Sequence, residues 1–271
     1  MTQTVFPMPH RAVLAAVGSD TISFLNRILT CNVETLEPGD GVYGALLTPQ
    51  GKILTDMFVF KSDSGLLIDL PVSKFDAMHK RLNMLKLRAD VTLEKREELQ
   101  VFICKNGINF PVLAGTTPPG FSSDVQRVVS AGPQDHAQSE QFAYDALRTE
   151  AVFPEFGIDY ASGEVFPADI NMDLTNGIDF KKGCFVGQEV ASRMKRKTEV
   201  RKRMLRVSGA SGDFETGTEI TAGQSTIGTV TSWTGNQGLA LVRLDRLTKA
   251  LEAGTPVTIE DTPVECHVAA A

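Results

Sequence analysis

The chain has 271 residues and a formal net charge of −6, with 42% apolar and 22% charged residues. This composition is typical of a globular protein and excludes both a disordered and a collagen-like chain. No apolar run approaches the roughly 20 residues of a membrane helix, and no secretory signal begins the chain. We therefore expect a soluble, cytoplasmic protein without a membrane segment.

The N-terminal half predicts strands and helices in alternation. Residues 12–17 are an apolar run typical of a strand, and Ile22, Leu25 and Ile28 follow at helical spacing. A second helix with the same spacing is expected after Ser73. Further strands are expected over residues 42–48, 52–60, 66–70, 91–93 and 99–104. This order is typical of an α+β unit with helices on one face of a sheet.

Loop-rich segments divide the chain after this unit. Residues 115–124 and 130–141 are rich in Gly, Pro, Ser, Thr and Gln, which marks loops and a domain edge. Residues 142–148 resume order as either a helix or a strand. From Lys202 onward, short apolar segments alternate with Gly, Pro and Asn, which predicts a small closed or half-closed β-barrel.

The four cysteines are widely spaced, and the nearest pair, Cys31 and Cys104, is 73 positions apart. No pair has the spacing of a zinc site, so we predict neither a metal site nor a disulfide framework. Three of the cysteines are expected to be reduced, buried thiols. Cys184 differs because of the residues around it.

The most specific segment of the chain is the octapeptide KGCFVGQE at residues 182–189. Two glycines bracket Cys184, and a helical pattern begins directly behind it. A turn before a helix start, flanked by lysines, favours a thiolate, which is a good nucleophile or metal ligand. Two alternatives stay open: a cysteine that only packs between the glycines, and an anion held at the helix start.

The octapeptide resembles the signature of YgfZ-type folate-binding proteins, which are relatives of the glycine cleavage T-protein, an aminomethyltransferase. Residues 18–30, 48–56 and 148–159 resemble further segments of this family in the same order, and residues 228–240 resemble its C-terminal barrel. The resemblance covers nearly the whole chain, and the octapeptide is its most specific part.

The resemblance implies an α+β fold in which three lobes form a T-protein-like ring around a channel for tetrahydrofolate. The first α+β domain would be discontinuous and would comprise residues 1–48 and 142–200. Residues 49–141 would form the second α+β domain, and residues 201–271 the C-terminal β-barrel domain.

The function that the resemblance implies is a tetrahydrofolate-binding accessory protein, acting as a monomer. It would support assembly or repair of iron–sulfur clusters in client enzymes, including tRNA-modifying ones. Tyr144 would stack on the pterin ring, and Arg11 stands where the family has a second aromatic. The candidate catalytic residues are Cys184 and Lys182. The candidate cofactor-binding residues are Tyr144, Arg148, Glu150, Arg11, Gln188 and Glu189.

Two other functions stay open. One is a folate-dependent one-carbon transferase of the aminomethyltransferase type, but residues 51–56 keep only one aspartate, Asp56, of that enzyme's paired aspartates. Asp56 is otherwise expected to be a carboxylate on a surface strand. The other is a protein–protein adaptor whose folate pocket is empty.

A basic segment stands out from the acidic chain. Residues 193–203 hold seven basic residues and one acid. They would form a solvated helix face, attract the polyglutamate tail of a folate, or contact RNA. No aromatic residue lies among these charges, so we expect no direct binding to nucleic acid.

Overall fold

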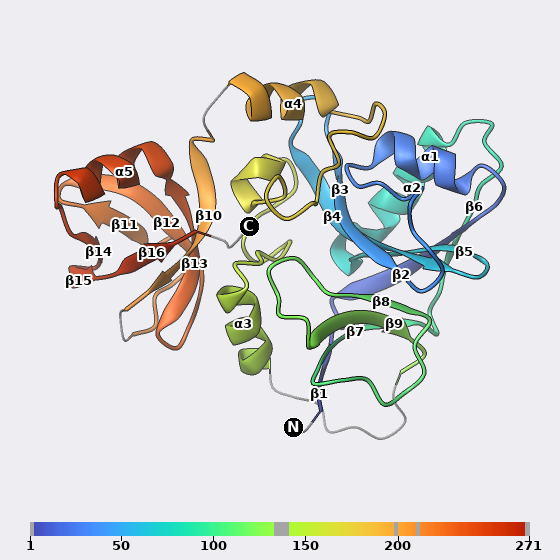
Figure 1. Ribbon diagram of the computed structural model, residues 1–271, viewed down its shortest axis with the longest axis horizontal. Helices are drawn as coiled ribbons and strands as arrows, with labels where there is room; N and C mark the ends of the chain where they lie inside the picture. Colours follow the sequence, from blue (N-terminus) through green and yellow to red (C-terminus); the bar gives the residue numbers. More distant parts are fainter. Residues whose placement is uncertain (1–2, 133–140, 198–199, 210–211, 269–271) are drawn as a thin grey trace.

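The computed structural model describes residues 3–132, 141–197, 200–209 and 212–268 (Figure 1). Three β-sheets organise this described part of the chain. The C-terminal sheet lies at one side of the molecule, and the other two sheets lie at the opposite side (Figure 1). Helix α3 and the chain that follows it run between these two sides (Figure 1). No helix in the described part is long and apolar enough to cross a bilayer.

The first sheet is antiparallel and has the strand order β3-β4-β5-β2-β6. Its strands are β2 (Arg11–Val17), β3 (Gly41–Leu47), β4 (Ile53–Ser62), β5 (Gly65–Pro71) and β6 (Thr92–Lys95). Helices α1 (Thr21–Ile28) and α2 (Phe75–Leu85) pack on one face. The sequence predicted each of these elements to within a few residues, because their apolar spacing is regular.

Strand β4 is buried on both faces. Met57 and Val59 pack with the helices, whereas Phe58 and Phe60 belong to the core on the other face. This alternation follows from the two-residue period of a strand. The first sheet is therefore a middle layer between the helices and a second sheet.

The second sheet has the strand order β1-β7-β9-β8. Its strands are β1 (Thr4–Pro7), β7 (Gln100–Lys105), β8 (Ala114–Thr116) and β9 (Val125–Ser130). The sequence prediction missed β1, β8 and β9. β1 is a short edge strand that ends in proline, and β9 carries a buried arginine at its centre, so neither has a regular apolar pattern.

The structure differs from the predicted domain boundary at residue 48. β3 and β4 lie on either side of that boundary, yet they are paired along their length. Gly41 lies opposite Phe60 at one end of this pairing, and Leu47 lies opposite Ile53 at the other. β1, from the extreme N-terminus, instead pairs with β7 in the second sheet. The first segment therefore contributes strands to both sheets and does not form a lobe with residues 142–200 alone.

Helix α3 (Gln141–Glu150) resolves the open choice between helix and strand for residues 142–148. The chain from residue 151 to 187 is largely irregular, apart from the short helix η2 (Pro167–Ile170). Helix α4 (Gln188–Lys197) then leads toward the C-terminal region.

The C-terminal region is a seven-stranded sheet with the order β15-β14-β11-β12-β13-β10-β16. Its strands are β10 (Lys202–Ser208), β11 (Glu219–Ala222), β12 (Ser225–Thr234), β13 (Gln237–Arg243), β14 (Val257–Ile259), β15 (Thr262–Pro263) and β16 (Glu265–His267). Helix α5 (Leu244–Glu252), which the sequence prediction missed, buries Leu247 and Ala250 against the sheet.

Candidate functional site

The loop before helix α4, residues 177–187, carries most of the octapeptide and is called the signature loop below. Asp179 fixes its course, because its Oδ1 accepts hydrogen bonds from the backbone N–H groups of Lys181 (2.7 Å) and Lys182 (3.1 Å). The backbone N–H of Asp179 donates to the Thr30 carbonyl, and the Thr30 hydroxyl donates to the Gly177 carbonyl. The loop is therefore attached to the segment that follows α1.

Lys182 anchors the same loop from inside. Its ammonium donates to the backbone oxygen and to the Oδ1 atom of Asn26 in α1, and it lies 5.4 Å from the centre of the Phe185 ring. Burial lowers the pKa of Lys182, and the nearby Cys31 and Asp179 oppose that shift. This lysine points into the protein, so its role here is to hold the loop in place.

Two glycines allow the signature loop to touch the turn at residues 48–51. Gly187 and Gly51 both have φ of +81°, a conformation that favours glycine. A Cβ at Gly187 would lie 2.8 Å from the Thr48 carbonyl oxygen, and a Cβ at Gly51 would lie 2.8 Å from the Val190 Cβ. Two of the sequence segments that resemble the folate-binding family, residues 48–56 and 182–189, are thus in contact.

Cys184 is exposed on this anchored loop. Cys31 and Cys104 are buried, and Cys266 is intermediate, so Cys184 is the accessible thiol among the four, all of which lie in the described part of the chain. Burial raises the pKa of Cys31 to about 12 and those of Cys104 and Cys266 to about 11. These three thiols stay protonated at neutral pH.

The position of Cys184 relative to the helix differs from the prediction. Helix α4 begins at Gln188, four residues beyond the cysteine, so the thiol does not sit at the helix start. Gln188 makes a long contact of 3.4 Å to the Gly183 carbonyl, and Glu189 pairs with Arg193 at 2.6 Å on the exposed helix face. A Cβ at Gly183 would meet no atom within 4 Å.

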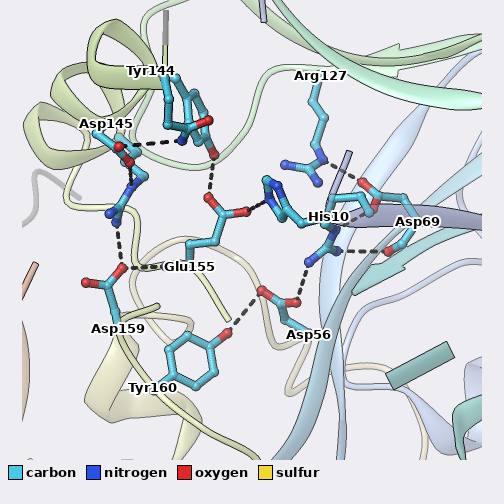
Figure 2. A network of polar contacts seen from close by, with 12 residues as sticks. His10, Asp56, Asp69, Arg127, Tyr144, Asp145, Glu155, Asp159 and Tyr160 are labelled. Atoms are coloured by element: carbon cyan, nitrogen blue, oxygen red, sulfur yellow. Dashed lines mark hydrogen bonds and ion pairs between the residues drawn. The ribbon is translucent and has the colours of Figure 1, made fainter. Parts of the chain in front are cut away.

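A second group of functional candidates lies in the interior between the sheets and is called the central cluster (Figure 2). Its members come from the turn before β2, from β2, β3, β4, β5, β9 and α3, and from the irregular chain behind α3. They are His10, Arg11, Tyr43, Asp56, Asp69, Arg127, Tyr144, Asp145, Arg148, Glu155, Asp159 and Tyr160.

One half of the central cluster surrounds Arg11. Its Nη1 donates to Asp56 Oδ1 (3.0 Å), its Nε donates to Asp69 Oδ1 (2.6 Å), and its Nη2 donates to the Asp69 carbonyl (3.1 Å). Asp56 Oδ2 accepts from the hydroxyls of Tyr43 (3.2 Å) and Tyr160 (3.0 Å). Asp56 is therefore buried and fully partnered, which corrects the expectation of a surface carboxylate.

Asp69 bridges two arginines. Its Oδ2 accepts from Arg127 Nε at 2.6 Å, opposite the bond from Arg11. Burial alone would raise the pKa of Asp69, but the charges of Arg11 and Arg127 outweigh burial and hold it below the ordinary value. The Nη2 atom of Arg127 is buried without a hydrogen-bond partner, and its guanidinium lies 4.5 Å from the centre of the Phe58 ring.

The other half of the cluster surrounds Glu155. Its Oε1 lies 2.5 Å from His10 Nε2, and its Oε2 accepts from the Tyr144 hydroxyl at 3.0 Å (Figure 2). Burial acts to raise the pKa of Glu155, but the hydrogen bond and charge of His10, with the charges of Arg127 and Arg11, lower it to about 2. Burial raises the pKa of Tyr144 well above its ordinary value, so its hydroxyl stays protonated and donates.

Asp159 joins the cluster to the C-terminal region. Its Oδ2 accepts from Arg148 Nη1 (2.6 Å) and from the backbone N–H of Glu155 (2.8 Å). Its Oδ1 accepts from the hydroxyls of Thr231 and Ser232 in β12, each at 2.7 Å. The second contact of Arg148 is with Asp145, one turn earlier in α3.

The predicted site residues therefore fall into two groups. Cys184, Lys182, Gln188 and Glu189 belong to the signature loop and α4, whereas Arg11, Tyr144 and Arg148 belong to the central cluster; Glu150 is exposed at the end of α3. No hydrogen bond or ion pair of the described residues joins the two groups. The cluster residues that sequence reasoning missed are His10, Tyr43, Asp69, Arg127, Asp145, Glu155, Asp159 and Tyr160.

The basic segment at residues 193–203 is less uniform than its sequence suggests. Arg203 is buried and forms a two-bond pair with Asp173, with both distances 2.9 Å. Lys195 lies 4.1 Å from the centre of the Phe180 ring, beside a cavity of about 420 Å³ that Asp179 and Lys181 also line. The side chains of residues 196–199 lie outside the described part of the structure.

A pterin ring needs a slot and hydrogen-bonding groups that are free to receive it. Tyr144 is only 1% exposed and its hydroxyl is bonded to Glu155, while Asp56 and Glu155 are both paired within the protein. A cavity of about 360 Å³ reaches Arg11, but none of these three residues lines it. The residues of the central cluster, as arranged here, do not fit a bound pterin.

Similarity to known proteins covers most of the chain. Residues 201–270 match the family described as CAF17, C-terminal beta-barrel domain. The chain is 28% identical to a mitochondrial iron–sulfur cluster assembly factor IBA57 homolog of Pyricularia oryzae, over 92% of this chain and 74% of that protein. It is 25% identical to the human mitochondrial factor IBA57, over 89% of this chain and 78% of that protein.

A third relative is longer than this chain. The IBA57 homolog of Neurospora crassa is 29% identical over 73% of this chain, and the matched region spans about half, 52%, of that protein. All three relatives are named as mitochondrial proteins, so the prediction of a cytoplasmic location is wrong.

The fold prediction is confirmed by a solved structure. The glycine cleavage system aminomethyltransferase T of Bartonella henselae superimposes with a TM-score of 0.75 at 16% identity, over 98% of this chain and 85% of that protein. The chain therefore has a T-protein-like fold of mixed α and β content, with a C-terminal region that matches a β-barrel domain.

Proposed function

We propose that this chain is an accessory factor that supports the assembly or repair of iron–sulfur clusters in client enzymes. The relatives named as iron–sulfur cluster assembly factors support this proposal, since the similarity extends over most of the chain. The single observation that carries it is an exposed cysteine on a loop that is anchored at several points.

The thiol of Cys184 supplies the chemistry in this proposal. A thiolate is a soft ligand for iron and a nucleophile toward sulfur. Lys182 acts on it as a positioning residue, because its bonds to Asn26 fix the backbone next to the cysteine. The thiol is open to solvent, and a Cβ at the neighbouring Gly183 would meet no atom within 4 Å.

We further propose that the chain acts as a monomer of the YgfZ type and that its clients include tRNA-modifying enzymes. A tetrahydrofolate requirement is a further part of the proposal, and the central cluster as described does not supply the pterin site.

Replacement of Cys184 tests the assembly role. In cells that depend on this chain for iron–sulfur assembly, we expect Cys184→Ala to lower the activity of a [4Fe–4S] client enzyme, while the melting temperature stays unchanged because the side chain is exposed. Cys266→Ala, which removes a thiol from the C-terminal sheet, is the matched control and should keep client activity. Full activity of Cys184→Ala would refute the proposed role of this thiol.

One-carbon transfer is the alternative function, and the geometry gives it little support. Asp56, the aspartate retained from the aminomethyltransferase pattern, is tied to Arg11 and to two tyrosines. Purified protein, tetrahydrofolate and an aminomethyl donor should therefore give no turnover. Measurable turnover would favour the transferase over the accessory factor.

A further inference from the structure

A polar cavity of about 420 Å³ lies beside the signature loop. Lys181 of that loop and Lys195 of α4 line it, together with Asn32 from the segment after α1. Cys184 follows Lys181 by three positions, and three residues span at most about 11 Å of extended chain. A polypeptide that reaches the thiol of Cys184 therefore passes close to this cavity.

Two aspartates that line the cavity are already bound within the protein. Both oxygens of Asp173 accept hydrogen bonds from Arg203, each at 2.9 Å. One oxygen of Asp179 accepts two backbone N–H groups of the signature loop, and the other accepts the side-chain amide of Asn32 at 3.2 Å. Neither carboxylate therefore needs a lysine of the cavity wall as its partner.

The two lysines of the cavity wall are, by contrast, open to a ligand. Lys181 and Lys195 are exposed, and neither forms an ion pair with another residue of the described part of the chain. The Lys195 ammonium lies 4.1 Å from the centre of the Phe180 ring, which also lines the cavity and keeps this charge at its wall. Arg193, on the exposed face of the same helix, is instead paired with Glu189. The cavity thus offers two ammonium groups to an anion.

The rest of the wall indicates what kind of anion fits. Val42, Ile178 and Phe180 give the cavity apolar surface next to its two lysines. A glutamate side chain matches both features, because its methylene groups pack on apolar surface and its carboxylate accepts charge-assisted hydrogen bonds. We infer that the cavity receives an acidic segment of the client protein and so places the client beside Cys184. The inference rests on the proposed function, because a factor that acts on clusters in client proteins must bring a client surface to its thiol.

The test compares two peptides that carry the same activated disulfide. One peptide is rich in glutamate, the other has glutamine at the same positions, and each has a terminal cysteine joined to thiopyridine. The Cys184 thiolate attacks the peptide sulfur, a new disulfide forms and the thiopyridine thiolate leaves, so the absorbance of the released thiopyridone gives the rate. The ratio of the two rates cancels any change in the reactivity of the thiol itself.

We expect the glutamate peptide to react about tenfold faster than the glutamine peptide with the full-length wild type at low ionic strength. K181E/K195E should remove this preference, and C184A should abolish both reactions. K80E/K249E is the matched control, since it makes the same change in net charge at two exposed lysines, in α2 and α5, and should keep the preference. K181Q/K195Q removes the two charges without adding acids and should also lose the preference.

Three outcomes would overturn the inference. The first is equal rates for the two peptides with the wild type, and the second is a preference that survives in K181Q/K195Q or falls equally in K80E/K249E. The third is loss of the preference in inorganic phosphate but not in chloride of equal ionic strength, which would assign the cavity to a phosphate ligand. The client assay of Cys184→Ala is independent of these rates, so reduced client activity with equal peptide rates would reject the cavity and keep the proposed function.

Discussion

The signature loop presents its reactive side chain to solvent, whereas the central cluster keeps its charges in the interior. Cys184 is exposed, and the loop beneath it is held by bonds from Asp179 and Lys182. In the cluster, Asp56 and Asp69 are buried and paired with arginines. A change of the exposed Cys184 side chain should therefore alter chemistry with little loss of stability, whereas removal of a buried partner in the cluster should destabilise the fold.

Removal of Asp69 should have the largest effect. Asp69→Ala leaves Arg11 and Arg127 as buried cations without their shared partner, and breaking a buried pair of this kind costs about 3–5 kcal/mol. Urea denaturation measures the loss. Asp245→Ala, which breaks an exposed pair with Arg243, is the control and should leave the midpoint unchanged. Equal midpoints for both variants would contradict the distinction between the two regions.

Low pH should reduce the free energy of unfolding by protonating Glu155 in the central cluster. The pKa of this group is about 2 in the folded protein and ordinarily 4.5, so folding favours the carboxylate. Its stabilisation is complete above pH 4.5 and is lost as the pH falls toward 2, with an upper limit of about 3 kcal/mol. The difference in unfolding free energy between the wild type and Glu155→Gln should shrink across this window. A difference that does not change with pH would show that the carboxylate is not stabilised by folding.

The two glycines of the signature loop should respond unequally to substitution. Gly187→Ala places a Cβ against the Thr48 carbonyl at positive φ and should cost about 1–3 kcal/mol. Gly183→Ala places a Cβ in open space and should leave the melting temperature unchanged. Thermal unfolding of the two variants compares them directly. Equal losses would mean that the contact between residues 48–51 and 187 is not formed.

Replacement of Cys184 should have the smallest effect on stability, and thiol labelling should distinguish its exposed side chain from the buried cysteines. One thiol of the native protein should react rapidly with a disulfide reagent, and Cys184→Ala should abolish this fast phase. The melting temperature of Cys184→Ala should stay within about 1 °C of that of the wild type, as for other substitutions at exposed positions. A fast phase that persists in Cys184→Ala would mean that another cysteine is accessible in solution.

The sequence predicted the loop better than the cluster, for a physical reason. The signature is contiguous, so its glycines, lysine and cysteine can be read together. The cluster gathers Asp56, Asp69, Arg127 and Glu155 from distant segments, and only pairing makes their burial tolerable.

Signals for two of its members were nonetheless present. Asp69 stands inside the run Leu66, Leu67, Ile68, Asp69, Leu70, and Arg127 stands between valines in residues 125–129. A lone charge within an apolar strand indicates a buried partner. The first sheet followed from regular apolar spacing, whereas β1, β8 and β9 lacked it. Helix α5 has a helical apolar spacing at Leu244, Leu247 and Leu251, and the sequence prediction overlooked it.

The carboxylate of Asp159 connects the C-terminal sheet to the interior of the molecule. Thr231 and Ser232 both donate to one of its oxygens, while Arg148 donates to the other. A pivot of the sheet away from α3 would break two bonds to the same oxygen at once, and water would have to replace both. The two hydroxyls thus tie the C-terminal sheet to the buried Asp159, and separation of the sheet would expose that carboxylate to solvent.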